Sequence, residues 1–404
     1  MSPARTLFVT GPGGDGTSTV AAATALAAAR AGQAALLLSA EPPARLAALL
    51  GADPGTDGPA EVAPGLTAVR VDAADRFRAG ARAAQRHLRP ALDAVGAVAL
   101  DDDELTELPG AETAALLTAL FAAHAADPGR LVVVDLPPIP EGVRLLALPA
   151  QLRRYLRRLL PPERRAARAL RPLLAQLAGV PLPGEGLYAA GERWDAGLTA
   201  VDGLVAGPGA AVRLVLDPGE RSAAALRAAR AGLALHGIPV EAVVANRLLP
   251  AGSSDPWLAG LADRQRAVLD ALTRSTGLPE PHQLPHLGRD IGPAELAALA
   301  VPPPGDPDLA EPVLEDRLAD DGLLVWHLPL PGATRDELAL VRRGDELIVT
   351  TGPFRRALPL PAALRRCTVA GAALERETGE LAVRFAPDPD RWPERALRDV
   401  GQPG

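Results

Sequence analysis

Residues 6–19 read TLFVTGPGGDGTST, and the fold predicted for the N-terminal part of the chain follows from this stretch. Its first five residues form an apolar, partly β-branched run that is typical of a buried strand. A glycine-rich loop comes next, and the alanine-rich residues from Thr19 to Ala31 favour a helix. A strand, a glycine loop and a helix in this order can hold a phosphate group with backbone N–H groups at the helix N-terminus.

Four further apolar runs indicate strands, and each is continuous rather than alternating. Continuous runs are typical of strands that are buried on both faces, as in a parallel sheet covered by helices. A helix is predicted over Glu220–His236, between the last two runs. Strands that alternate with helices predict an α/β domain with a doubly wound, mostly parallel sheet. The runs are Ala34–Leu38, Leu131–Asp135, Val212–Leu216 and Val240–Ala245.

Helical patterns fill the long connections of this domain. One lies between the second and third predicted strands, and another runs from Gln151 to about Val205. We expect these helices to form a cap beside the sheet. Prolines interrupt both regions and indicate helix ends. They are Pro109, Pro161, Pro162 and Pro172.

The segment Leu152–Leu160 has an amphipathic pattern in which arginines occupy one helix face and leucines another. Arg153 pairs with Arg157, and Arg154 with Arg158, at helical spacing. A solvated face of the cap is the favoured interpretation. The alternative is a site for an anionic membrane or an acidic partner, and peripheral membrane contact has no other support.

The pattern changes beyond a Pro/Asp-rich linker at residues 301–308. Short alternating runs with glycine-containing turns between them predict a small antiparallel β-sandwich. We therefore predict the α/β domain over residues 1–310, the sandwich over 318–387 and a polar tail over 388–404. The alternating runs are Leu323–His327, Glu337–Val341, Glu346–Thr351, Arg356–Leu360 and Leu381–Phe385.

Composition narrows the function classes. A net charge of −7 gives no general attraction to nucleic acid, so we do not expect the chain to bind it. The single cysteine, Cys367, leaves no internal disulfide and no multi-thiolate zinc or arsenite site, so we expect no zinc. The first residues are too short and too broken in pattern for a signal peptide or a membrane span. We expect a cytoplasmic protein.

The glycine loop resembles the deviant Walker A motif Gly-Lys-Gly-Gly-Val-Gly-Lys-Thr-Thr of the arsenite-pump and tail-anchored-protein-targeting ATPases, the ArsA-like family. Four other segments resemble motifs of that family, in the same order along the chain. They are Leu36–Pro42 for the first switch, Glu107–Glu112 in the helical region, Asp135–Pro138 for the second switch, and Val243–Leu248 for the strand whose asparagine recognises adenine.

The resemblance implies an ATP-binding dimer with helical caps that handle cargo. It implies nucleotide contacts from Asn246 and from the loop, magnesium contacts from Ser18 and Asp135, and a part in hydrolysis for Glu41 and Asp135. It also implies a homodimer, or a heterodimer with a related ATPase, and a protein client. The loop residues concerned are Gly11, Gly13, Gly14, Gly16, Thr17, Ser18 and Thr19.

The departures from the family pattern fall on the cations. Pro12 stands where the family has the lysine that reaches the partner's nucleotide, and Thr17 stands where it has the lysine that contacts the β- and γ-phosphates. All 42 basic residues of the chain are arginines, so codon bias alone would have placed arginine at these positions. Asp15 is expected to add negative charge to the loop, and Pro140 departs from the second-switch pattern.

Because phosphoryl transfer depends on positive charge around the γ-phosphate, these changes predict inefficient hydrolysis. The favoured interpretation is a nucleotide-responsive or chaperone-like partner-binding protein. One alternative is an active ATPase in which Arg5, Arg45 or a partner's arginine replaces the lysines. The other is a nucleotide-free scaffold, or a heterodimer partner of an intact homologue.

The C-terminal runs resemble the small heat-shock (α-crystallin) module, which a subset of this family carries. Residues 328–333, 336–340, 344–349, 356–361, 369–375 and 379–385 match its pieces in order. The resemblance implies partner binding by strand addition. The alternative is a plain sandwich that packs on the first domain. Cys367 is interpreted as a small buried apolar residue.

Overall fold

The computed structural model describes residues 5–56, 58–94, 98, 100–159, 185–305, 309–375 and 378–392. The chain divides into two compact units, and each unit is made of several segments of the sequence. The first unit comprises Met1–Thr6, Ala28–Asp135 and Arg144–Ala210, and the second comprises Leu7–Ala27, Leu136–Val143 and Ala211–Gly404.

The strands before residue 300 form one eight-stranded sheet with the order β3-β4-β2-β5-β1-β6-β7-β8. Strand β2 pairs in parallel with β4 and β5, and β7 pairs in parallel with β6 and β8, whereas β3 and β4 are antiparallel. The prediction of a mostly parallel sheet is confirmed. The strands are β1 (Arg5–Thr10), β2 (Ala35–Ser39), β3 (Ala60–Ala63), β4 (Leu66–Arg70), β5 (Leu131–Asp135), β6 (Ala210–Leu216), β7 (Val240–Leu248) and β8 (His282–Pro285).

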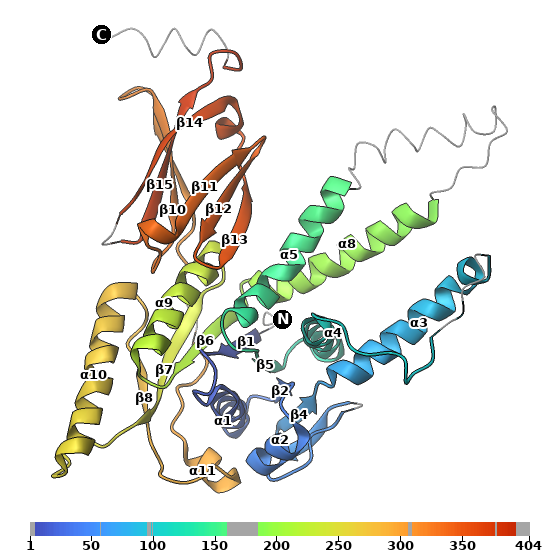
Figure 1. The fold of residues 1–404 in the computed structure, drawn as a ribbon, viewed down its shortest axis with the longest axis vertical. Coiled ribbons are helices and arrows are strands. Elements are labelled where there is room, and N and C mark those ends of the chain that lie inside the picture. The colour runs from blue at the N-terminus through green and yellow to red at the C-terminus, as the bar shows by residue number, and fades with distance from the viewer. Residues whose placement is uncertain are drawn as a thin grey trace. The chain divides into compact units, whose positions relative to one another are not determined.

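Most of these strands are followed in the sequence by a helix, which can be traced in Figure 1 by the colour change along the chain. All residues of β2, β5 and β6 are buried, which explains why their sequences do not alternate and are apolar except at Ser39, Asp135 and Arg213. The helices are α1 (Thr17–Arg30), α2 (Pro43–Leu50), α3 (Ala73–Ala94), α4 (Ala111–Ala126), α5 (Glu141–Leu159), α8 (Glu185–Ala206), α9 (Glu220–Leu235), α10 (Pro256–Thr276) and α11 (Pro293–Ala298).

One part of the sequence prediction for this domain was incomplete. Only helix was predicted between the second and third strands, but residues 60–70 form the antiparallel pair β3 and β4. Two short runs meet here at Pro64 and Gly65, and Gly65 has a positive φ of 76°. A turn that requires this backbone conformation favours a strand pair over a helix.

The expected helical cap is present in the first unit, where α4 contacts α3, α8, β2 and β5. Pro109 precedes α4, as predicted for a helix break. The other three prolines, at positions 161, 162 and 172, lie outside the described residues.

The arginine-rich segment belongs to α5, up to Leu159. Arg153 Nη1 lies 2.7 Å from Asp202 Oδ2, and its Nε lies 3.7 Å from Asp195 Oδ1. Arg157 Nε also lies 3.9 Å from Asp195 Oδ1. Both carboxylates belong to α8, so this arginine pair faces a neighbouring helix of the same unit.

The C-terminal part forms two antiparallel sheets, with the orders β14-β15-β10-β9 and β11-β12-β13. Leu381, Val383 and Phe385 alternate along β15 and are buried, as the alternating pattern predicted. Strand β9 lies before residue 318, and the domain boundaries themselves stay predictions. The elements are β9 (Val313–Arg317), β10 (Leu323–Pro329), η1 (Arg335–Glu337), β11 (Leu338–Arg343), β12 (Glu346–Thr351), β13 (Phe354–Pro359), η2 (Ala363–Arg366), β14 (Cys367–Leu374) and β15 (Glu380–Pro387).

The sandwich packs on α9, which belongs to the same unit. Arg227 Nη1 donates to the Gly332 carbonyl at 2.8 Å and lies 3.0 Å from Glu337 Oε2. Arg356 Nη1 donates to the Leu235 carbonyl at 2.8 Å. Helix α9 is therefore held by both η1 and β13.

Replacing Gly232 by leucine should loosen this contact. A Cβ atom at Gly232 would lie 2.4 Å from Cδ2 of Phe354, so a larger side chain must displace the ring. We expect a loss of about 1–3 kcal/mol in the free energy of unfolding and faster proteolysis of the sandwich. Gly197→Leu on the exposed face of α8 is the matched control, since nothing lies within 4 Å of its Cβ position. Equal proteolysis of the two variants would contradict this packing.

The buried His236 at the end of α9 should make stability depend on pH. Burial first, and then the Arg356 charge, lower the pKa of His236 from 6.5 to about 3. Because the folded state disfavours the imidazolium, this contribution is complete above pH 6.5 and is lost as pH falls toward 3. The expected loss is about 1.4 kcal/mol per pH unit. Urea unfolding at several pH values between 7 and 5 measures how steeply the free energy of unfolding changes with pH. We expect this dependence to be weaker in His236→Gln than in the wild type, and unchanged in the control His286→Gln, whose side chain is exposed.

Candidate functional site

The glycine loop joins β1 to α1 in a conformation that requires glycine. Gly13, Gly14 and Gly16 have φ values of 106°, 81° and 88°. A Cβ atom at Gly16 would also lie 2.3 Å from Nδ2 of Asn246, so no side chain fits there. Helix α1 starts at Thr17 and has no acidic residue in its first turn, which leaves the N-terminal dipole favourable to an anion. The predicted residues Thr17, Ser18 and Thr19 lie in this first turn.

Two consecutive residues at the end of β7 hold two consecutive carbonyls of the loop. Asn246 Nδ2 donates to the Asp15 carbonyl at 2.8 Å. Arg247 Nη1 donates to the Gly14 carbonyl at 2.7 Å. Asn246 is buried, and its amide nitrogen orients the loop in this structure. No sequence pattern indicated a role for Arg247.

The Asp15 carboxylate does not lie where the sequence analysis expected it. Its Oδ1 accepts hydrogen bonds from Asp217 N at 2.7 Å and from Ser222 Oγ at 3.2 Å. Both donors come from the connection between β6 and α9 and its first turn, and the carboxylate is buried. Desolvation, only partly offset by these two hydrogen bonds, raises the pKa of Asp15. The carboxylate thus faces the β6–α9 connection, which weakens the expectation that it repels a phosphate group in the loop.

The second-switch segment contacts the same loop. The N–H of Ile139 donates to the Gly11 carbonyl at 2.9 Å, and Thr10 Oγ1 donates to the Pro137 carbonyl at 2.9 Å. A Cβ atom on Gly13 would lie 3.3 Å from Cβ of Pro138. Residues 137–139 therefore contact the loop directly.

In the first unit, a serine joins the two predicted acidic residues. Ser39 Oγ donates to Asp135 Oδ2 at 2.8 Å and accepts from Glu41 N at 3.2 Å. Glu41 also lies 3.1 Å from Arg45 Nη1. Strands β2 and β5 are parallel neighbours, so their carboxyl ends meet. The structure brings Glu41 and Asp135 together through Ser39, whose position at the end of a buried strand was the available sequence signal.

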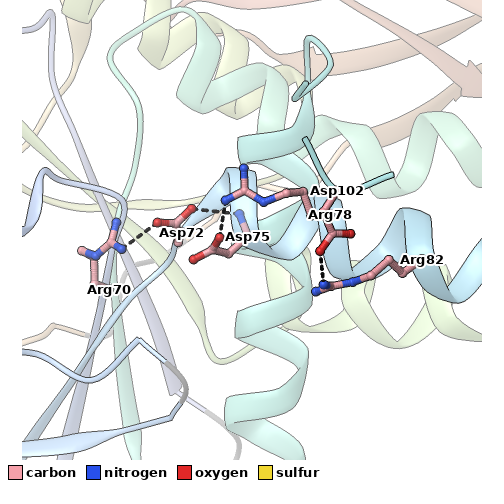
Figure 2. A network of polar contacts seen from close by, with 6 residues as sticks. All are labelled: Arg70, Asp72, Asp75, Arg78, Arg82 and Asp102. Carbon is pink, nitrogen blue, oxygen red and sulfur yellow. Dashed lines mark hydrogen bonds and ion pairs between the residues drawn. The ribbon is translucent and has the colours of Figure 1, made fainter. Parts of the chain in front are cut away.

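A network of ion pairs lies beside this site at the start of α3 (Figure 2). Arg70 Nη2 lies 2.6 Å from Asp72 Oδ2, and Asp72 Oδ1 accepts from Asp75 N at 3.0 Å. The Asp75 hydrogen bond, and then the Arg70 guanidinium, lower the pKa of Asp72. Figure 2 also shows Arg78 paired with Asp75, and Arg82 paired with Asp102. The network fixes the turn from β4 into α3.

This turn forms one wall of a cavity of about 540 Å³. The segment Glu107–Glu112 and Ala40 also line this cavity. Burial, and then the charges of Glu107 and Glu41, raise the pKa of Glu112. The helical-region motif that the sequence analysis noted therefore lies close to the first-switch residue Glu41.

The part of the chain that the structure describes contains no cluster of three or more histidine, cysteine or acidic side chains arranged to hold a metal ion. None of its helices combines the length and the apolar character that a membrane span requires.

Two family profiles match the chain. One, described as anion-transporting ATPase, covers residues 4–277. The other, described as an HSP20-like domain found in ArsA, covers residues 321–385. Together they account for the sheet domain with its glycine loop and for the sandwich.

Several known proteins are similar over nearly their whole length. Protein SCO2128 of Streptomyces coelicolor is 55% identical over 96% of this chain and 99% of its own length. Protein Rv2184c of Mycobacterium tuberculosis is 33% identical over 96% and 98%. A protein of Aquifex aeolicus named as an arsenical pump-driving ATPase is 24% identical over 92% and 98%.

Proposed function

This chain belongs to the anion-transporting ATPase family, and on that premise we propose that it binds ATP in its glycine loop, hydrolyses it inefficiently, and uses the bound nucleotide to control binding of a protein partner. It has the HSP20-like C-terminal domain found in ArsA. The compartment we propose is the cytoplasm, and the assembly is a dimer, either of this chain or with a related ATPase.

The proposal rests on a loop that has the glycine conformation needed to bind phosphate but lacks the two lysines of the family motif. Gly13, Gly14 and Gly16 have positive φ values in a loop that leads into the N-terminus of α1. Backbone N–H groups of this kind fit a phosphate group. Positions 12 and 17 are proline and threonine. ATP binding depends on the backbone, whereas transition-state stabilisation depends on the charges. The absence of the two lysines should therefore impair hydrolysis more than binding.

The same residues suggest how ATP and magnesium would be held. Backbone N–H groups of the loop and of the first turn of α1 would contact the phosphates, and the Ser18 hydroxyl and the Asp135 carboxylate would hold Mg²⁺. The N–H groups belong to Gly11, Gly13, Gly14, Gly16, Thr17, Ser18 and Thr19. Bound Mg²⁺ neutralises charge on the phosphate oxygens. Glu41 and Asp135 would orient the attacking water, and the Ser39 hydrogen bond to Asp135 limits the positions of that carboxylate.

The sandwich supports the partner-binding half of the proposal. Its sheets end at β9 and β14 in one case and at β11 and β13 in the other. Four of the five residues of β9 are exposed. Sheet edges can accept an extended segment of another protein by strand addition. A protein client bound in this way is the partner that we propose.

Restoring the two lysines tests the catalytic half of the proposal. We expect Pro12→Lys combined with Thr17→Lys to raise ATP turnover by about 100-fold or more, because each added cation stabilises charge that develops in the transition state. Turnover is measured as phosphate release with magnesium. The additional substitution Asp135→Asn should abolish the gain. A wild-type chain that already turns over at about 1 s⁻¹ or faster would contradict the proposal.

A further inference from the structure

We propose that Arg247 is a positioning residue of this site: through a charge-assisted hydrogen bond it orients the loop peptide that follows Gly14. The inference rests on the proposed function, since it concerns how the same loop receives a nucleotide. Residues 11–19 contain no cationic side chain. The guanidinium of Arg247 is hydrogen-bonded to that loop.

The orientation follows from peptide geometry. In a planar trans peptide the C=O and the N–H of the same unit point in opposite directions. Arg247 holds the carbonyl of the Gly14–Asp15 unit, and Asn246 holds the carbonyl of the Asp15–Gly16 unit. The N–H groups of Asp15 and Gly16 therefore point away from the end of β7. Two adjacent N–H groups that point the same way form the donor pair that an anion needs.

The backbone at Arg247 is held in a conformation that few side chains adopt. Its φ is 59°, and it is the one non-glycine residue with positive φ in the part of the chain that the structure describes. Gln265 of α10 supports this turn, because its Nε2 donates to the Arg247 carbonyl at 3.2 Å and its Oε1 accepts from Leu249 N at 2.9 Å. An unusual conformation fixed by a second element is typical of functional positions.

The charge of Arg247 is only partly compensated. Asp217 Oδ2 lies 3.7 Å from Nη1, and the Arg247 side chain is 43% exposed. The remaining positive charge strengthens the hydrogen bond to the Gly14 carbonyl, as expected for a charge-assisted donor. Asp217 also donates its N–H to Asp15, so one short segment anchors both the loop and its cation.

Three variants test this role in the full-length protein: Arg247→Gln, Arg247→Lys and, as a matched control, Arg266→Gln on the exposed side of α10. Binding of a fluorescent ATP analogue with magnesium and hydrogen exchange of the loop peptide without nucleotide are both measured, together with the melting temperature. We expect Arg247→Gln to weaken binding by about 10-fold or more and to speed exchange. Arg247→Lys should recover part of the affinity, because it retains the charge but not the fork.

Two results would overturn the inference in distinguishable ways. If the wild type binds nucleotide and Arg247→Gln matches Arg266→Gln in affinity and exchange, the role of Arg247 is wrong while the proposed function stands. If the wild type binds no nucleotide, the proposed function fails. Faster exchange in Arg247→Gln than in Arg266→Gln would then still support the positioning role of Arg247, whereas equal exchange in the two variants would overturn that role as well.

Discussion

Glu241→Ala is expected to lower the free energy of unfolding by about 3–5 kcal/mol, because it leaves a buried arginine without its charge partner. The side chains of Arg213 and Glu241 are 0% and 1% exposed, and Arg213 Nε lies 2.6 Å from Glu241 Oε1. Arg213 also donates to Thr24 Oγ1 at 2.8 Å and to the Pro303 carbonyl at 3.2 Å. The pair therefore joins β6, α1 and β7 to the start of the linker.

Urea unfolding of the full chain measures this effect. Asp263→Ala is the control, because it breaks an ion pair whose carboxylate is 69% exposed, and its loss should stay within about 1 kcal/mol. Combining Arg213→Met with Glu241→Leu should cost less than Glu241→Ala alone, since no buried charge remains unpaired. A loss below about 1 kcal/mol for Glu241→Ala would contradict this account of the pair.

Gly16→Ala is expected to abolish nucleotide binding. The alanine must adopt a φ of 88°, and its Cβ would lie 2.3 Å from Nδ2 of Asn246. The side chain of Asn246 must then move, and the Asp15 carbonyl loses the hydrogen bond that orients the next N–H group. We expect affinity for ATP to fall by about 100-fold or more, together with a loss of about 1–3 kcal/mol in stability.

The matched control is Gly252→Ala. Gly252 has a similar φ of 76°, and nothing lies within 4 Å of its Cβ position. That substitution introduces the same backbone strain away from the loop, so it should lower stability without changing nucleotide affinity. If both variants bind ATP as the wild type does, the loop is not the nucleotide site.

The sequence predicted the sheet well because its strands are buried on both faces. Leu36, Val133 and Leu214 are buried in strands that contain few polar residues, so their runs do not alternate and are easy to recognise. Strands β3 and β4 were missed because they are short and lie near the edge of the sheet. Residues of β3 are intermediate or exposed, and this removes the hydrophobic pattern on which strand prediction depends.

The site was predictable only where backbone chemistry decides it. The glycines of the loop could be recognised in the sequence, because no other residue type fits at Gly16, with its positive φ and its short distance to Asn246. Ser39 and Arg247 did not, because each acts through a tertiary contact with a distant residue, Asp135 in one case and Gly14 in the other. The direction of the Asp15 carboxylate likewise depends on Asp217, about 200 residues along the chain.

Equilibrium dialysis of the full-length protein against labelled ATP and magnesium, followed by chromatography of the bound nucleotide, tests the central claim most directly. The account predicts saturable binding with a Kd between about 1 and 100 µM, or roughly −8 to −5 kcal/mol, and recovery of the bound nucleotide as intact ATP. No bound nucleotide at millimolar ATP, or recovery of ADP formed at ordinary enzymatic rates, would contradict it.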